Sequence, residues 1–248
     1  MMNLRLFAHS VLMVTEKDMR IYYYKGSVVI FGLLFPFIMF LTFFIGRNLD
    51  ITLFFPSFLG MMLFFSSSST GPLITPWEKR EKTYERLVSL PVQIGSVVLG
   101  DILSGAVFGM GITTLVWIGG TLLLHLQLAH PLLLIPALVL GSLTFASLGT
   151  LLASPATDTP SNIMMYSNLV RLPLIFVSGI FIPLSQLGSW AWTNELSPLT
   201  YLVDLFHAAL TGDAVFPAAI DAGALIVITS IFIIAAKVIQ EHNLISGR

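Results

Sequence analysis

Residues 27–46 read SVVIFGLLFPFIMFLTFFIG, an uncharged and almost wholly apolar run. A helix rises about 1.5 Å per residue, so this run is long enough to cross the roughly 30 Å hydrocarbon core of a bilayer. Within lipid, every backbone amide has to be hydrogen-bonded inside its own segment, which favours a helix. This stretch therefore predicts a transmembrane α-helix.

Further apolar runs lie on the C-terminal side of the first one. Asp101 interrupts one of them and Arg171 lies within another. Such long, unbroken runs exclude a membrane β-barrel, whose strands would be short and alternating. We expect an all-α membrane protein that forms a single transmembrane domain, residues 1–248. Its six predicted transmembrane helices are 27–46, 51–75, 93–124, 131–153, 163–182 and 218–239.

The composition agrees with a membrane protein. Of the 248 residues, 56% are hydrophobic and 10% are charged, and the mean hydropathy is +0.89. Soluble domains average about 25% charged residues, so this chain lacks the polar side chains to cover its surface in water. The net charge of −1 gives no basic field for nucleic acid. Charges in the first 25 residues leave no signal-peptide core, so we expect the first span to direct insertion.

Lysine and arginine lie mostly on one side of the predicted spans. Only Arg47 falls on the opposite side, and Arg171 lies inside the fifth span. Because basic residues favour the cytoplasmic face, both termini are predicted to face the cytoplasm, with the protein in the plasma (cell inner) membrane. The basic residues on this side are Arg5, Lys17, Arg20, Lys25, Lys79, Arg80, Lys82, Arg86, Lys237 and Arg248.

Three segments outside the spans bear on function. Residues 1–26 mix apolar and charged side chains, which indicates a helix in the cytoplasmic interface. Residues 76–92, PWEKREKTYERLVSLPV, are either a helix docked to a partner or a solvated loop that only enforces topology. Residues 183–216 are too apolar for a solvated loop, and we expect about two short helices at the outer mouth of the bundle. Spans 1–2 (27–75), spans 3–5 (93–182) and span 6 with the tail (217–248) complete the predicted order.

Two charges within spans need an explanation, because a charge at the bilayer centre costs roughly 2.5–3.5 kcal/mol on insertion scales. Asp101 and Arg171 each lie eight residues into their predicted spans, about 12 Å from the cytoplasmic edge. We expect both side chains to face the bundle interior at matching depth, where they either form a candidate intramembrane ion pair or line an inner vestibule. The alternative is that each side chain bonds locally or snorkels.

Catalytic signatures are absent from the sequence. There is no GxxxxGK[ST] phosphate loop and no GxSxG elbow, and the histidines show no metal-ligand spacing. Cysteine is absent as well. We therefore expect no catalytic site, no metal and no cofactor in this chain, so that any ATP and Mg would be bound by a partner.

Two motifs carry a resemblance to a known family. In REKTYERLVSLPV, residues 80–92, a charged run with Thr-x-Glu (Thr83 and Glu85) is followed by Leu87 and Pro-Val. SGIFIPLSQL, residues 178–187, precedes LSPLTYLVDLFHAALTG, residues 196–212. Together these motifs resemble the permease, or transmembrane subunit, of type-2 ABC exporters. The second motif matches that family at Ser178, Gly179, Pro183, Leu184, Leu187, Pro198, Leu199, Tyr201 and Gly212.

The resemblance implies a dimeric permease, expected to be a homodimer, with an ABC ATPase subunit beneath each copy. Residues 1–26 would be the elbow helix, 76–92 the coupling helix and 183–216 a re-entrant outer hairpin that includes Trp190 and Trp192. Two departures stand out, because Lys82 replaces the family's usual glycine and His207 lies near a position often taken by arginine. The expected ATPase-coupling residues are Glu78, Arg80, Glu81, Thr83, Glu85, Arg86, Leu87 and Leu90.

The scarcity of buried charges favours an apolar or amphipathic cargo, such as a lipid, drug or glycolipid, exported at the expense of ATP. A secondary transporter or channel is the alternative, although only Asp101 and Arg171 supply polar groups within the spans. A membrane enzyme would need a cluster of carboxylates or histidines at one interface, and the sequence shows none.

Overall fold

The computed structural model describes residues 4–44, 51–83, 93–125, 128–155, 159–180 and 194–245. Throughout these ranges the chain is helical and contains no β-strand, as expected. The elements are α1 (Leu4–Asp18), π-helix η1 (Met19–Tyr23), α2 (Gly26–Phe44), α3 (Ile51–Ser68), α4 (Gly71–Arg80), α6 (Ile94–Leu124), α7 (Pro131–Ala153), α8 (Pro160–Val177), α9 (Pro198–Leu210) and α10 (Ala218–Ile245).

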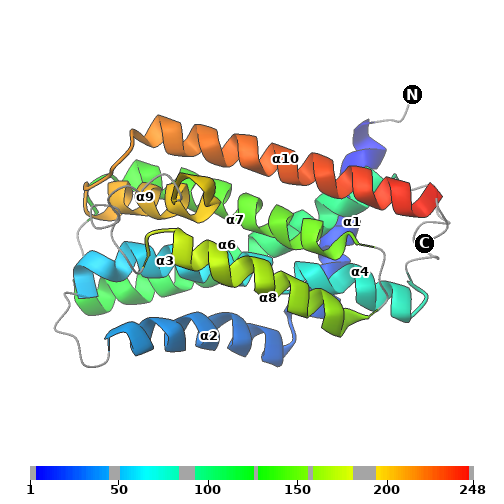
Figure 1. The fold of residues 1–248 in the computed structure, drawn as a ribbon, viewed down its shortest axis with the longest axis horizontal. Coiled ribbons are helices and arrows are strands. Elements are labelled where there is room, and N and C mark those ends of the chain that lie inside the picture. The colour runs from blue at the N-terminus through cyan, green and yellow to red at the C-terminus, as the bar shows by residue number, and fades with distance from the viewer. Residues whose placement is uncertain are drawn as a thin grey trace.

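The long helices run lengthwise beside one another, whereas α1 crosses one end of the bundle (Figure 1). The segment formed by α1 and η1 meets α2 at an angle of 87°. Both termini lie at the end that α1 crosses, and α4 ends there too (Figure 1). The opposite end holds α9. The N-terminal helix is thus placed across the bundle end, as an interfacial helix would be.

Within the described ranges, four helical segments are long and apolar enough to cross a membrane. A fifth is added if the bent pair of α1–η1 and α2 counts as one broken span. The six predicted spans are therefore confirmed only as helices, and their number remains a prediction. The predicted spans that are missing from these four correspond to α2 and α8. Helix α8 has only 18 residues and includes the polar side chains of Asn162, Asn168 and Arg171. The four segments are Ile51–Arg80, Ile94–Leu123, Pro131–Ala153 and Ala218–Leu244.

Helix α3 lies at the centre of the core and packs against α2, α6, α7 and α9. Every residue from Phe55 to Ser68 is buried. Phe64 meets Phe145 of α7 edge to face at 4.8 Å. Small residues allow the helices to approach closely, since a Cβ on Gly109 would lie 1.9 Å from Ser67 Oγ. The serine run of this span therefore serves helix packing.

The predicted second span and the predicted coupling segment meet within one helix. Residues 76–80, expected to begin the cytoplasmic coupling segment, form the second half of α4, and the membrane boundary at residue 75 stays a prediction. Pro72 occupies the first turn of α4, where its missing N–H costs nothing, so a new helix starts directly after the break at 69–70. The chain leaves helical geometry at Lys82, whose φ is 57°.

Candidate coupling site

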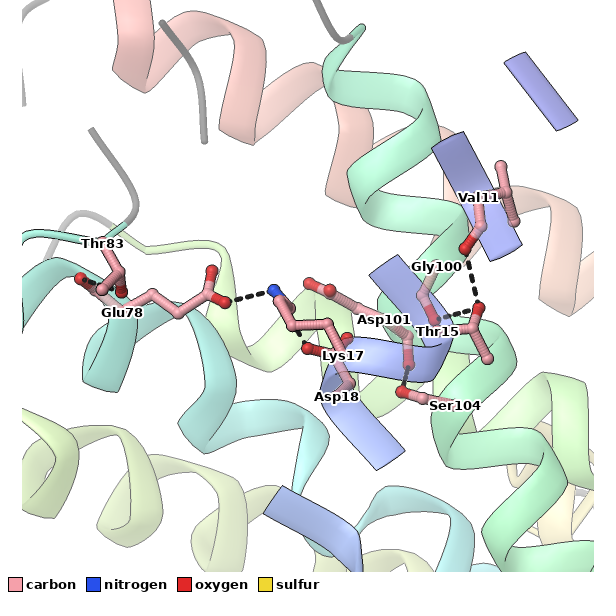
Figure 2. Close-up of polar contacts among 9 residues, drawn as sticks. All are labelled: Val11, Thr15, Lys17, Asp18, Glu78, Thr83, Gly100, Asp101 and Ser104. Carbon is pink, nitrogen blue, oxygen red and sulfur yellow. Dashed lines mark hydrogen bonds and ion pairs between the residues drawn. The ribbon is translucent and has the colours of Figure 1, made fainter. Parts of the chain in front are cut away.

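Helix α1 is anchored on α6 through close backbone approach. Thr15 Oγ1 lies 2.9 Å from the carbonyl oxygen of Val11 and 3.2 Å from that of Gly100 (Figure 2). Glycine is required at position 100, because a Cβ there would lie 2.5 Å from Cγ1 of Val14. Val14 itself is 5% exposed. The side of α1 that carries Val14 is therefore packed against α6.

Lys17 joins α1 to α4. Its ammonium group forms an ion pair with the carboxylate of Glu78 and lies 3.1 Å from Asp18 Oδ1 (Figure 2). The side chain of Lys17 is 24% exposed, that of Glu78 5% and that of Asp18 not at all. This pairing links two elements that are 61 residues apart in sequence.

Asp101 of α6 adds a third carboxyl group beside Lys17 (Figure 2). It is 3% exposed, and its Oδ1 accepts no hydrogen bond from the described residues. Burial lowers the pKa of Lys17, but the carboxylates of Asp18, Glu78 and Asp101 outweigh burial, so the net shift of this pKa is upward. Burial also raises the pKa of Asp18, against the attraction of Lys17. The ammonium group of Lys17 is thus the shared positive charge for three buried carboxyl groups.

An aromatic contact joins the same two elements a turn further along. The rings of Tyr22 in η1 and Trp77 in α4 stack with centroids 5.6 Å apart. Lys25 Nζ lies 5.8 Å from each ring centroid, within the range of cation–π attraction. The N-terminal segment therefore holds α4 at two separate points.

The predicted coupling residues divide into three groups. Arg80, Glu81 and Thr83 are exposed at the end of α4, with Thr83 Oγ1 donating to the carbonyl oxygen of Glu78 (Figure 2). Glu78 is instead 4% exposed and forms an internal ion pair with Lys17, and its contact with an ATPase stays a prediction. The remaining residues, Glu85, Arg86, Leu87 and Leu90, lie outside the described residues.

Asp101 and Arg171 do not form an ion pair with each other. The four ion pairs among the described residues involve neither side chain. Asp101 faces α1, whereas Arg171 lines a cavity with residues of α2 and α3.

The outer segment is tied to the end of α8 through α9. Ser197 precedes α9, accepts from the backbone N–H of Leu199 and donates to the carbonyl oxygen of Leu174. Pro198 starts this helix, and Tyr201 donates to the carbonyl oxygen of Glu195 at 2.9 Å. Gly179 adopts a φ of 80°, which turns the chain after α8.

The rest of the predicted hairpin, including Pro183, Trp190 and Trp192, lies outside the described residues. The carboxylate of Asp204 accepts from the backbone N–H groups of Val215 and Phe216, which anchors the connection to α10. One helix of this segment, α9, is therefore seen packed at the outer end of the bundle, against α3, α7 and α10.

Sequence reasoning missed the role of Lys17 and Asp18, which it treated as ordinary charges of an interfacial helix. A signal was present, since Val11, Val14 and Asp18 follow helical i, i+3 and i+7 spacing and share one face. A carboxylate on an apolar face needs a partner. The spacing does not reveal which residue that partner is.

A bundle of long apolar helices, with a buried charge cluster joining α1 to the end of α4, is typical of a multi-pass membrane protein. Residues 11–211 match the ABC-2 type transporter family. The chain therefore belongs to the ABC-2 type transporter family and is a multi-pass membrane protein. This membership favours an ATP-driven transporter over the alternative of a secondary carrier or channel.

Curated relatives point in the same direction. The chain is 26% identical over 148 residues to nodulation protein J of Rhizobium meliloti, which covers 59% of this chain and 56% of that relative. It is 30% identical to nodulation protein J of Bradyrhizobium diazoefficiens, with the same coverage. The protein of the same name from Rhizobium leguminosarum bv. trifolii is 28% identical over 150 residues. The matches thus span just over half the length of these relatives.

Proposed function

We propose that this chain is the membrane subunit of an exporter that moves an amphipathic molecule, such as a lipid, drug or glycolipid, out of the cytoplasm. Two copies would pair in the inner membrane, each with six spans and both termini in the cytoplasm. The concentration of basic residues at one end of the bundle supports this orientation. The all-helical fold and the family support the architecture.

The observation that carries the proposed mechanism is the ion pair between Lys17 and Glu78. Glu78 lies in the last turn of α4, directly before residues 81–92. If the ATPase binds that segment, a movement of the ATPase would displace α4. Through the ion pair of Lys17 with Glu78, the same movement would also displace α1. The exposed side chains of Arg80, Glu81 and Thr83 would contact the ATPase, together with the four predicted residues further along, Glu85, Arg86, Leu87 and Leu90.

The proposed cargo class rests on apolar surface within the bundle. A groove of about 610 Å³ lies between α2, α3 and α6. Its walls are almost entirely aliphatic and aromatic, with Phe37 and Phe55 on facing helices and Gly120 at its base. A groove of this kind suits an acyl or other apolar chain better than a polar solute.

The test is reconstitution of the chain with its ABC ATPase in phospholipid vesicles, followed by measurement of ATP hydrolysis and of fluorescent phospholipid export. Glu81→Lys should leave insertion intact, since Glu81 is exposed, but reduce permease-stimulated hydrolysis about tenfold through charge repulsion at the interface. Glu241→Lys is the matched control, a charge reversal near the end of α10 that should have no effect.

Two results would reject the proposal. Normal stimulation by the Glu81→Lys variant would remove the segment after α4 from the coupling mechanism. Export driven by an ion gradient, with no ATPase present, would show that the chain is not an ATP-driven exporter subunit.

A further inference from the structure

Arg171 is a buried cation without a visible counter-charge. Its side chain is 3% exposed, in the middle of a helix whose neighbouring positions are largely exposed. Neither its Nε nor its Nη2 donates to any acceptor among the described residues. These two atoms carry three of the five guanidinium N–H groups. Most of the hydrogen-bonding capacity of this side chain is thus unused within the described structure.

Such an arrangement is costly unless something compensates it. A buried charge is tolerated where it is paired and hydrogen-bonded, and an ionisable side chain inside a membrane protein marks a functional site by default. The four ion pairs of the described residues leave Arg171 out. The compensating negative charge is therefore not supplied by any described carboxylate.

The space beside Arg171 is suited to an external group. A cavity of about 290 Å³ lies between α2, α3 and α8. Water in the liquid occupies about 30 Å³ per molecule, so the cavity has room for a phosphate or carboxylate group and the start of a chain. Ser69, Asn168 and Arg171 form the polar part of the cavity wall, and Phe35 and Phe65 form the aromatic part. Gly32 also lines the cavity.

The geometry of the wall indicates how a ligand would be oriented. Phe35 and Phe65 meet edge to face at 4.8 Å and form the apolar side. Asn168 is exposed and Phe35 is 37% exposed, so both border the opening, whereas Arg171 lies deeper. The cavity thus offers a buried cation with aromatic surface beside it.

We propose that this cavity binds the oxyanion head group of an amphipathic molecule, a phosphate, carboxylate or sulfate, with Arg171 as its counter-ion and the apolar part against Phe35 and Phe65. A planar guanidinium suits such groups because it can donate two parallel hydrogen bonds to one oxyanion. This inference deepens the proposed function, on which it rests for the identity of the ligand as cargo.

The experiment measures equilibrium binding of dodecyl phosphate to the complex of the full chain with its ATPase, solubilised in the neutral detergent dodecyl maltoside and without nucleotide. The wild type should bind, and Arg171→Gln should weaken binding about tenfold or more, because charge-assisted hydrogen bonds are lost. Arg171→Lys keeps the charge but loses the two parallel hydrogen bonds, so its affinity should lie between those of the wild type and Arg171→Gln. Lys237→Gln, which removes a cation from α10, is the matched control and should not change binding.

Binding of inorganic phosphate distinguishes an amphipathic ligand with a phosphate head group from a small soluble anion. Weak or no binding of inorganic phosphate supports an amphipathic ligand, whereas affinity equal to that of dodecyl phosphate overturns it in favour of a soluble anion. Equal binding of dodecyl phosphate to the wild type and to folded Arg171→Gln would overturn the site itself.

A second variant covers the case in which Arg171→Gln fails to fold. Asn168→Trp should narrow the opening while leaving Arg171 in place, because Asn168 is exposed at the cavity wall. Weakened binding supports the proposal, and unchanged binding rejects it. Because no ATP is used, loss of ATPase coupling with intact binding would reject the proposed function and leave this site standing.

Discussion

Lys17 of α1 forms an ion pair with Glu78 of α4, although 61 residues separate them in sequence. Glu78 is buried and lies directly before the segment expected to contact an ATPase. Lys17 belongs to a helix that crosses the bundle end and packs on α6 (Figure 1). The pair therefore connects the crossing helix with the part of the chain that is closest to the partner subunit.

Removing the cation from this cluster should cost more than removing one of its carboxylates. Lys17→Met leaves the buried carboxyl groups of Asp18, Glu78 and Asp101 without their ammonium partner and should destabilise the fold by about 3 kcal/mol or more. Glu78→Gln should cost less, because Lys17 keeps two acidic neighbours. Thermal unfolding of the purified variants measures both changes.

The control for this prediction is Arg20→Met. It breaks an exposed pair with Glu16 and should change stability by less than about 1 kcal/mol. A larger loss in Glu78→Gln than in Lys17→Met would contradict the role assigned to Lys17.

Close approach of α1 to α6 should make Gly100 intolerant of any side chain. Gly100→Ala places a methyl group against Val14 and should destabilise the protein by about 1–3 kcal/mol through overpacking. Gly111→Ala is the matched control in the same helix, since no atom lies within 4 Å of its new methyl group. That control should be neutral, or stabilising by up to about 1 kcal/mol through helix propensity. Similar melting temperatures for the two variants would argue against the α1–α6 contact.

The left-handed backbone at Lys82 should favour glycine. A φ of 57° costs a residue with a side chain about 1–2 kcal/mol, so Lys82→Gly should raise the free energy of unfolding by about 1 kcal/mol. This position is also where the resemblance placed the family's usual glycine. Arg80→Gly, two residues earlier and inside α4, should instead lower stability by about 1 kcal/mol. Chemical denaturation in mild detergent compares the two, and a loss of stability in both would refute the turn.

Acidification should weaken the outer end of the bundle through His207. Burial lowers the pKa of His207 from its ordinary value near 6.5, against the attraction of Asp204 and Asp213, and Ser57 Oγ lies 3.2 Å from its ring. Because the unfolded chain then binds the proton more readily, stability is fully present above about pH 6.5 and is lost as the pH falls below it. The melting temperature of the wild type should drop between pH 7.5 and pH 5.5.

The variant His207→Gln keeps a hydrogen-bonding group beside Ser57 but cannot titrate in this range. Its melting temperature should therefore fall less between the two pH values than that of the wild type. His9→Gln changes an exposed histidine on α1 and should show the full drop. An identical drop in all three proteins would mean that His207 does not contribute.

Local patterns predicted most of the helices. The predicted spans 93–124 and 131–153 coincide within a residue with α6 and α7, because in each case a long apolar run ends at polar or helix-breaking residues. The predicted end of the fifth span at 182 was too late, because Gly179 turns the chain after Val177. Apolar residues alone do not reveal such a turn.

The contacts between elements that are distant in sequence could not be predicted from the sequence alone. The depth of Asp101 and Arg171 suggested a pair, but rotation about the helix axes decides which side chains meet. Asp101 faces α1, and Arg171 faces the cavity beside α2 and α3. The burial of Glu78 was missed for a similar reason, because a run of charges next to a membrane is usually solvated.

The π-helix η1 follows the contact of Lys17 with α4 and contains Tyr22, which makes the second contact, so the length of the N-terminal segment is critical. A π turn accommodates one residue more than an α turn, and such turns are rare outside functional sites. Deleting one residue from Met19–Tyr23 would restore a regular helix and rotate the residues after the deletion by about 100° relative to those before it. Lys17 could then still reach Glu78, while Tyr22 and Lys25 would swing away from Trp77. The extra residue thus acts as a spacer that keeps both attachments in register.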